Sequence, residues 1–579
     1  MSTTAVSYES LSAGALALKL DDNGAFAREI ALAGEELFRG IGFVVRDADW
    51  DTCSLPAKAI IRRAGESATA QSGGALDHAS GDLDWSVTWA ISDRGVEARA
   101  RATSRSGFET SRTGLVVLHA LGATRGRPVK VTHSDGSVEE TLFPDLVSPN
   151  QPFFDIAALE YATAAGHRLR LSFAGDVFEI EDERNWTDAC YKTYCPPLGL
   201  GQPYRIGPSV IVEQTVKLEI LAAAPAIAPA RHARPRMEMT ATLPALGTSL
   251  QPGAIGIGQP EALKALRLGF TAIEIDLSDD DWLAGARAKI AAAPGPLRLD
   301  IRESLSGAAG EAIVALAPLL AAKEIVGLSL WDADDAALTA ARAAAPGLRI
   351  GGGTGASFTE LNRMERWPAA DYLCWTSNPT VHGFDDDTIG ETIESVRDLV
   401  RTARARSPVA RFQIGPMTLG FRYSPGAATP AGRAQTAPPD VRQGGMIAAA
   451  WLVGTIAGLV DPAVETLTFF EPAGPKGLLS SDGRWSPSAH VLSRLAPYAG
   501  RPVSGLRWPG VSRAAGLLIE DPDERILCFA HSRDEELPAN LPPGVWSRME
   551  RLTENGFVAA PTAEFRAQPF SVWWAIGPR

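Results

Sequence analysis

Carboxylate side chains follow apolar, strand-like runs in the middle of the chain. Glu471 comes directly after the apolar run 466–470. A carboxylate that leaves an apolar strand is partly desolvated, which tends to raise its pKa and suits it to accept a proton near neutral pH. Glu360 lies a few residues beyond another such run, at 348–351. Two carboxylates across one opening can act together as acid and base, so Glu471 and Glu360 are the first catalytic candidates.

A histidine and several ligand-binding side chain types follow the same or neighbouring runs. His382 lies in a loop between Pro379 and Gly383, which favours a polar role over a packing role, and it is the third catalytic candidate. The candidates for binding a ligand at the same opening are Asn362, Arg363, Asn378, Asp385, Arg422 and Lys476. The acidic run 385–387 precedes a helix, so at least one of its members is expected to be a helix cap, and we assign that role to Asp386 and Asp387.

The sequence favours chemistry without a metal or cofactor. His382 and Asp385 could ligate a metal, but no HExxH, HxH or CxxC spacing accompanies them. A relaxed dinucleotide fingerprint at 351–356 is not followed by a clear helix. The chain contains neither the phosphate-binding GxxxxGK[ST] motif nor the GxSxG motif of serine esterases. We therefore expect no bound metal and no cofactor.

The elements that must position these residues alternate between short apolar strands and Ala-rich helices. Eight strand-and-helix pairs over roughly 250 residues predict a (β/α)8 TIM barrel, whose reacting groups lie on the loops after the strands. Ile389, Ile393, Val396 and Val400 form one apolar stripe of helical period. The predicted strands are 254–258, 271–277, 297–301, 325–331, 348–351, 371–376, 410–415 and 465–470.

Period-two alternation on both sides of the barrel predicts antiparallel sheets. The expected architecture is multidomain α/β and β, with the barrel flanked by an N-terminal β-sandwich and a small C-terminal β-domain. A stretch rich in Ala and Pro marks the first boundary. The expected bounds are 1–221 for the sandwich, 222–240 for the linker, 241–495 for the barrel and 496–579 for the C-terminal domain.

Composition excludes several classes of protein. The chain of 579 residues has 45% hydrophobic residues and a formal net charge of −13, and no basic run could follow a nucleic-acid backbone. The five cysteines are too few and scattered for a disulfide framework. Neither a signal peptide nor an apolar run of membrane-spanning length is visible. We expect a cytoplasmic protein with no nucleic-acid or membrane partner, and the number of subunits stays open.

Polar residues also crowd into the stretch 178–194 of the N-terminal region. Glu181, Asp182, Glu183, Arg184 and Lys192 belong to it. A sugar-like ligand would suit this mixture of carboxylates, amides and aromatic rings. Ion pairs in which Arg184 and Lys192 neutralise the acids explain it equally well, so both interpretations stay open.

Several uncommon stretches occur in order along the chain: SPNQPFFDI (148–156), FEIEDERNWTDACYKTY (178–194), FTELNR (358–363), SNPTVHGFDD (377–386) and FFEPAGPKGL (469–478). Together they resemble the bacterial D-apionate lactonase family. The resemblance spans nearly the whole chain and implies hydrolysis of D-apionolactone to D-apionate in apiose catabolism. The barrel is also similar to those of the retaining glycosidases, although the strands carrying Glu360 and Glu471 are the fifth and eighth rather than that clan's fourth and seventh.

The resemblance leads to a hypothesis for the roles of the candidates in a hydrolase of a small sugar lactone. Glu471, or His382 in its place, deprotonates water, Lys476 and Asn378 hold the oxyanion, and Glu360 protonates the ring oxygen. Two alternatives stay open: a retaining glycosidase with Glu360 as acid/base and Glu471 as nucleophile, and a non-catalytic carbohydrate-binding protein.

Overall fold

The computed structural model of the chain divides into two compact units. The first comprises residues 1–184 and 189–229, and the second comprises residues 185–188 and 230–579. The barrel unit thus includes four residues that in sequence belong to the N-terminal region. The structure describes residues 7–226, 234–251, 259–302, 308–321, 323–423, 437–480, 482–509, 511, 513–536 and 539–579.

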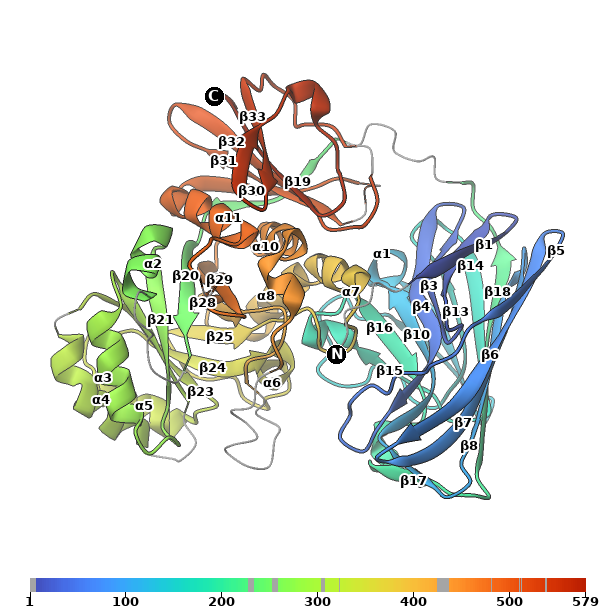
Figure 1. Cartoon of the computed structure of the whole chain (residues 1–579). Helices are drawn as coiled ribbons and strands as arrows, with labels where there is room; N and C mark the ends of the chain where they lie inside the picture. The colour runs from blue at the N-terminus through green and yellow to red at the C-terminus, as the bar shows by residue number, and fades with distance from the viewer. Residues whose placement is uncertain are drawn as a thin grey trace. The chain divides into compact units, whose positions relative to one another are not determined.

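The N-terminal unit contains two antiparallel sheets (Figure 1). One sheet has the order β1 (Tyr8–Ala13), β2 (Leu16–Asp21), β3 (Phe26–Leu32), β4 (Glu35–Arg46), β10 (Arg112–Ala120), β16 (Cys190–Tyr194) and β15 (Glu179–Asp182). The main path of the other is β12 (Val138–Leu142), β11 (Pro128–His133), β13 (Ile156–Ala162), β14 (Arg168–Ala174), β18 (Ile211–Ala222), β8 (Gly95–Thr103), β7 (Gly81–Ser92), β6 (Ser67–His78) and β5 (Ile60–Ala64), with β9 (Phe108–Thr110) and β17 (Tyr204–Ile206) beside it.

Apolar residues of both sheets form one core, as expected of a sandwich. Leu115 and Val117 of β10 are fully buried, as are Val87 and Trp89 of β7 from the other sheet. The alternation in β14 and β18 that predicted these strands is the same inward and outward period.

The polar stretch of the N-terminal unit is held together by buried ion pairs. Arg184 makes a two-pronged contact with Asp182, with Nε at 2.9 Å from Oδ1 and Nη2 at 2.7 Å from Oδ2. Its guanidinium also donates to the carbonyl oxygens of residues 144, 145 and 146. Lys192 pairs with Glu183. Arg184 and Lys192 thus neutralise the acids, as one of the two interpretations of this stretch expected.

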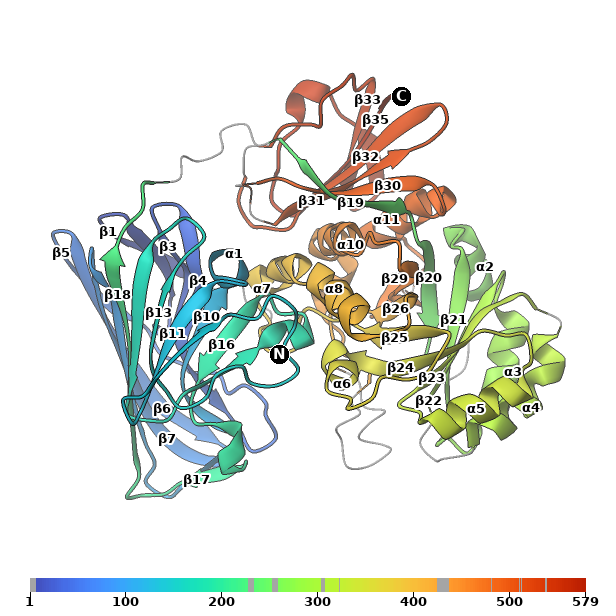
Figure 2. The same ribbon diagram turned by 180° about the vertical axis from the view of Figure 1, so that it is seen from behind.

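The second unit contains a closed barrel of eight parallel strands, so the predicted TIM barrel is confirmed (Figure 2). Each predicted strand from 271–277 onward overlaps one barrel strand. The predicted strand 254–258 lies outside the described residues, and the first barrel strand is β20 instead. The strands are β20 (Ala245–Leu250), β21 (Phe270–Asp276), β22 (Leu297–Arg302), β23 (Ile325–Trp331), β24 (Ile350–Ser357), β25 (Tyr372–Thr376), β26 (Phe412–Met417) and β27 (Val464–Phe469).

Helices follow most of the barrel strands. They include α2 (Gln259–Leu266), α3 (Trp282–Ala292), α4 (Ala308–Leu320), α5 (Asp335–Ala344), α6 (Phe358–Asn362), α7 (Asp386–Glu391), α8 (Val396–Arg406), α10 (Met446–Gly458) and α11 (Pro487–Leu495). The predicted apolar stripe from Ile389 to Val400 is buried, but its helix is divided into α7, a 3-10 turn at 392–394 and α8. No helix in the described part of the chain is long and apolar enough to cross a membrane.

The glycine-rich run in β24 serves close packing inside the barrel. A Cβ atom on Gly351 would meet the Tyr372 ring at 2.1 Å, and one on Gly355 would meet the Trp331 ring at 2.2 Å. Glycine is therefore required because bulky aromatic side chains lie against the backbone of this strand. The run is a barrel strand and not a dinucleotide-binding turn.

A C-terminal sheet packs on the barrel through α10, which Figure 1 shows between the two. Because α10 contacts apolar surface on both sides, its residues 447–458 are all buried. The sheet has the order β19 (Arg236–Thr242), β30 (Pro502–Arg507), β31 (Ala514–Glu520), β32 (Glu524–His531), β35 (Ser571–Pro578), β33 (Arg548–Thr553) and β34 (Gly556–Ala559). Strand β19 overlaps the stretch 222–240 that we expected to be linker only, because it completes this sheet by pairing with β30.

The buried pair of Arg184 and Asp182 leads to a stability prediction. Replacing Arg184 with Leu removes the guanidinium from the buried Asp182 carboxylate and the donor from three carbonyl groups, so we expect a loss of about 3–5 kcal/mol in the free energy of unfolding of the N-terminal unit. Urea denaturation measures this loss. The matched control is R99A, because Arg99 is 66% exposed beside Glu97 and its loss should cost under about 0.5 kcal/mol. Equal losses in both variants would contradict the prediction.

Candidate active site

Charged side chains gather at the carboxyl ends of the barrel strands. Glu274 lies near the carboxyl end of β21, and Arg302 is the last residue of β22. Arg422 follows β26, and Glu471 follows β27. Parallel barrel strands open into one shared mouth at these ends. We call Ser249, Glu274, Arg302, Arg422, Glu471 and Lys476 the Glu274 network, because Glu274 contacts or electrostatically influences most of its members.

Glu274 lies between two guanidinium groups inside the barrel. Its Oε2 atom is 2.8 Å from Nη2 of Arg302, and its Oε1 atom is 2.7 Å from Nη2 of Arg422. The Ser249 hydroxyl donates to Oε1 at 2.7 Å. Burial acts to raise the pKa of Glu274, but the charges of Arg422 and Arg302 outweigh it, and the pKa lies below its ordinary value. Glu274 is therefore an ionised anchor for both arginines.

Glu471 leaves the barrel through a constrained backbone position. Phe470, the residue before it, has φ of 54°, in a region that bulky residues rarely adopt. The Phe470 carbonyl is held there by β20, because it accepts hydrogen bonds from the Thr248 hydroxyl at 2.9 Å and the Ser249 amide at 3.1 Å. The direction in which Glu471 leaves the strand is thus fixed by the first strand of the barrel.

The Glu471 carboxylate is half-buried, and one of its oxygens has no hydrogen-bond donor among the described residues. Its Oε1 atom lies 3.9 Å from Nε of Arg422 and makes no hydrogen bond with any residue in the described ranges. Desolvation raises the pKa of Glu471, and Glu274 adds to the rise, while Arg422 and Lys476 oppose it. A carboxylate in this setting can accept a proton from a water molecule.

Lys476 lies on the turn between β28 (Glu471–Ala473) and β29 (Gly477–Leu479). Its carbonyl accepts the amide of Glu471 at 3.1 Å, which closes the turn. Burial lowers the pKa of Lys476, and the Glu471 charge opposes this. The turn thus joins the candidate base and a cation, as the sequence predicted.

Aromatic rings accompany Arg302 at the mouth. Its guanidinium lies 4.7 Å from the ring centre of Tyr423 and 5.6 Å from that of Trp331. Tyr423 is half-buried and Trp331 is the last residue of β23. Aromatic faces beside polar donors are typical of sites that bind hydroxylated ligands.

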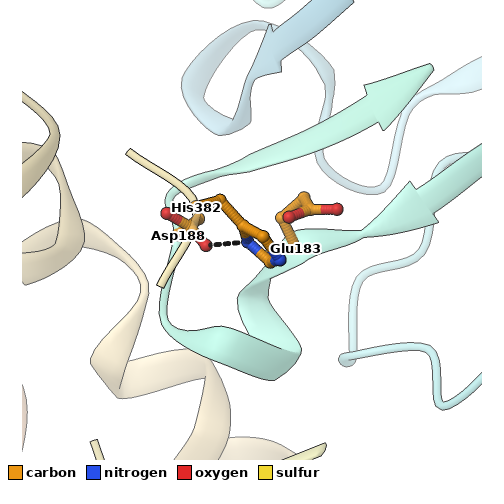
Figure 3. A group of neighbouring side chains, drawn as sticks. All are labelled: Glu183, Asp188 and His382. Atoms are coloured by element: carbon orange, nitrogen blue, oxygen red, sulfur yellow. Dashed lines mark hydrogen bonds and ion pairs between the residues drawn. The ribbon is translucent and has the colours of Figure 1, made fainter. Parts of the chain in front are cut away.

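His382 belongs to a second group of side chains in the barrel unit. Its Nδ1 atom is 2.8 Å from Oδ2 of Asp188, and Figure 3 shows the imidazole and this carboxylate facing one another. The Trp186 ring lies edge-on to the imidazole at 5.2 Å, and the Arg363 guanidinium lies over the Trp186 ring at 4.9 Å. We call these four residues the His382 cluster. A carboxylate bonded to one imidazole nitrogen fixes the tautomer and the orientation of the ring.

The segment 185–188 is tied to the barrel unit by several hydrogen bonds. Asn362 donates from its amide to Oδ1 of Asn185 at 2.8 Å, and the Thr187 hydroxyl lies 2.6 Å from that of Ser377. Asn362 also accepts a hydrogen bond from Arg406 at 2.6 Å. Asn362, expected to bind a ligand, thus holds the segment that carries Asp188.

Glu360 and Asn378 lie on neighbouring strand ends. Glu360 is in the first turn of α6, and its side chain is exposed. Desolvation raises its pKa, with Asp332 adding to the rise and Arg363 opposing it. Asn378 is buried after β25, and no described residue donates to its Oδ1 atom. Within the described ranges no hydrogen bond or ion pair joins Glu360 to Glu471, whereas Glu471, Arg422 and Lys476 form one electrostatic group.

Asp385 differs from the sequence-based expectation. It is the N-cap of α7, with its two oxygens accepting from the amide and the hydroxyl of Thr388, each at 2.9 Å. Asp386 and Asp387, expected to be the caps, pair with Arg442 and Arg513 instead. Because both Asp385 oxygens bond within the helix start, its assignments to substrate and to a metal shared with His382 lose their support.

Sequence reasoning missed Glu274 and Arg302. The predicted candidates lie on the loops after the strands, whereas Glu274 and Arg302 belong to the strands themselves. The signal was a charge within an apolar run, at position 274 of TAIEID. Asp188 belongs to the polar stretch 178–194, but its pairing with His382 could not be predicted, because His382 is 194 residues away in sequence.

Comparison with known proteins decides the family. Family models for the D-apionate lactonase N-terminal domain and TIM barrel domain match residues 1–223 and 331–500. A D-apionate lactonase of Brucella anthropi is 30% identical over 520 residues, which cover 82% of this chain and 84% of that protein. The chain belongs to the D-apionate lactonase family. It is therefore an enzyme of the hydrolase class, and the resemblance found in the sequence is confirmed.

Solved structures add only distant likenesses. A GH30 endoxylanase from Clostridium papyrosolvens C71 is 12% identical with a TM-score of 0.39, and covers 60% of this chain and 100% of its own. A conserved exported protein from Bacteroides fragilis is 7% identical with a TM-score of 0.41, and covers 59% of this chain and 100% of its own. Likenesses at this level do not extend the family assignment.

The revised role of Asp385 can be tested on this lactonase-family chain. We expect D385A to lower the free energy of unfolding by about 1 kcal/mol, because a helix loses its cap, and to leave KM unchanged. D385S should restore most of the stability, since serine also caps helices. Thermal unfolding and steady-state kinetics measure both quantities. A raised KM with unchanged stability would return Asp385 to the substrate.

Proposed function

We propose that the chain hydrolyses a sugar-acid lactone, D-apionolactone, to D-apionate in apiose catabolism, with Glu471 as the base that activates water. The named relative and the family models support the substrate class. The observation that carries the proposal is the half-buried Glu471 carboxylate at the end of β27, with an open oxygen and a raised pKa.

The base must be ionised but not tightly paired. Glu471 meets this condition with respect to Arg422, because Nε of Arg422 is 3.9 Å away and its guanidinium is already engaged with Glu274. A short ion pair would instead stabilise the carboxylate and weaken it as a base. The Glu274 network therefore keeps Glu471 basic by giving Arg422 another partner.

The tetrahedral intermediate needs donors for its oxyanion and a proton for the departing ring oxygen. Lys476 is a cation beside Glu471, and the buried Asn378 has an amide NH2 group that donates hydrogen bonds. In the proposal these two hold the oxyanion. Glu360, whose raised pKa favours the protonated form, gives its proton to the ring oxygen. Arg422 and Arg363 donate hydrogen bonds to the substrate hydroxyl groups.

His382 is the alternative base. Asp188 orients its imidazole through Nδ1, as a carboxylate does beside a histidine that acts as a general base. The two candidate bases belong to different groups of side chains, so substitutions at each can be compared separately.

The role of Glu471 predicts the effect of its removal. We expect E471Q to lower kcat for D-apionolactone by about a hundredfold or more, because an amide cannot accept the proton of water. Acid release monitored with a pH indicator measures the rate. The matched control is E465Q: Glu465 lies on the same strand but at its other end, paired with Arg349 and Arg411, and its loss should leave kcat within about twofold.

A near-wild-type rate in E471Q together with a strong loss in H382Q would move the base to His382. A mechanism-based fluorosugar separates lactonase from retaining glycosidase, since attack by water leaves no glycosylated carboxylate. Labelling of Glu471 by such a probe would overturn the proposal, as would lactone binding without turnover.

The pKa of Glu471 predicts the pH dependence. The base works as the carboxylate, so kcat/KM falls as the pH drops through its raised pKa, and the acid limb lies above the ordinary value of 4.5. Lys476 opposes this rise, so K476Q should shift the acid limb to higher pH. K323Q is the control, because Lys323 donates to the Ala293 carbonyl at 3.2 Å, before the start of β23. A limb that moves to lower pH in K476Q would contradict the assignment.

A further inference from the structure

Arg422 is buried, and its hydrogen-bond donors have no acceptor among the described residues. Its side chain is 3% exposed, and none of its three guanidinium nitrogens makes a hydrogen bond with any residue in the ranges that the structure describes. Nη2 is close to Glu274 at 2.7 Å, but without hydrogen-bond alignment. Open buried donors cost free energy unless a ligand satisfies them.

Arg298, another buried arginine of the barrel, has acceptors for its donors within the protein. Arg298 on β22 donates from Nε and Nη2 to one oxygen of Asp300, at 3.1 and 2.7 Å. Its charge and donors are used inside the protein. Arg422 has a neighbouring carboxylate in Glu274, but Glu274 also serves Arg302 at 2.8 Å. Arg302 has a second carboxylate, Asp276, at 3.6 Å, whereas Arg422 shares Glu274 and makes no hydrogen bond with any described residue.

The charged groups around Arg422 favour the binding of one anion. Arg302, Arg422 and Lys476 are cationic, and Glu274 and Asp276 are the carboxylates that face them apart from Glu471. When Glu471 holds a proton, the group carries a positive excess. A guanidinium binds a carboxylate in a planar, two-pronged geometry, so a carboxylate fits the open donors.

Lactone hydrolysis produces a carboxylate next to the base. The ring C–O bond breaks, a C–O bond to the water oxygen forms, and the ring oxygen becomes a hydroxyl. The new carboxylic acid then loses its proton, so a neutral ligand becomes an anion in the same site. The Trp331 and Tyr423 rings beside Arg302 offer apolar faces for its hydroxylated carbon chain.

We infer that Arg422 is a carboxylate-binding residue that recognises the open-chain aldonate, so that the barrel mouth binds its own product and is inhibited by it. The identity of the anion rests on the proposed lactone hydrolysis, whereas the anion site rests on Arg422 itself.

Calorimetric titration of the full-length protein with D-apionate tests the inference. The matched ligand is the neutral polyol of the same carbon skeleton, which has no carboxylate. We expect D-apionate to bind at least tenfold more tightly than the polyol and to compete with the lactone. R422Q should weaken aldonate binding by about ten- to a hundredfold, and R422K, which keeps the charge but not the planar fork, by less.

The matched protein control is R513Q. Arg513 is also fully buried, but it is paired with Asp387 and Glu391 of α7. Its loss should lower stability without changing aldonate affinity. If R422Q does not fold, the comparison of aldonate with polyol on the wild-type protein still decides the inference.

Equal binding of aldonate and polyol, or unchanged affinity in R422Q, would overturn the inference even if the lactone is turned over. Arg422-dependent aldonate binding without lactone turnover would support the anion site and refute the proposed reaction. A carboxylate already present on the substrate is the other source of the same group. An Arg422-dependent preference for lactones of sugar dicarboxylic acids over neutral lactones would assign the site to substrate and overturn product recognition.

Discussion

A carboxylate buried between two arginines organises the mouth of the barrel. Removing three charged groups from water is costly unless each is paired, so Glu274, Arg302 and Arg422 hold one another in place. Glu274 is shared between the two guanidinium groups, and Arg302 has a second carboxylate in Asp276 at 3.6 Å. Because Nε of Arg422 stays 3.9 Å from Glu471, one Glu471 oxygen and the Arg422 donors have no hydrogen-bond partner among the described residues. The buried charges thus leave polar atoms at the mouth that a ligand can satisfy.

The two ends of β27 show how the barrel gives one residue type two behaviours. Glu465 lies near the amino end of the strand, where Arg349 and Arg411 pair with it and, against the effect of burial, lower its pKa. Glu471 lies six positions further, beyond the other end, where burial dominates and the pKa is raised. The first carboxylate is a structural ion-pair partner, and the second is suited to proton transfer.

Much of the fold could be predicted because its signals are local. Alternation in the N-terminal strands and the stripe from Ile389 to Val400 report directly which faces are buried. The first barrel strand was misplaced because Ala245–Leu250 mixes Gly, Thr and Ser with apolar residues, whereas 254–258 has the apolar composition expected of a strand. Strand β19 was missed for another reason: its partner β30 is more than 250 residues away in sequence.

The site residues that follow the carboxyl ends of barrel strands could be predicted from the sequence. Glu471, Arg422 and Lys476 follow strand ends, and the structure groups them around Glu274. Glu274 itself was missed because an inward charge inside an apolar strand resembles an interruption of the pattern rather than a site. The three acids at 385–387 illustrate a further limit. Sequence spacing identifies a helix cap but not which acid provides it. The choice depends on Arg442 and Arg513, which lie 56 and 126 residues from their partners. Catalytic candidates on loops can thus be read from the chain, but the buried charges that set their pKa values come from strands far apart in sequence, and their effect exists only once the barrel closes.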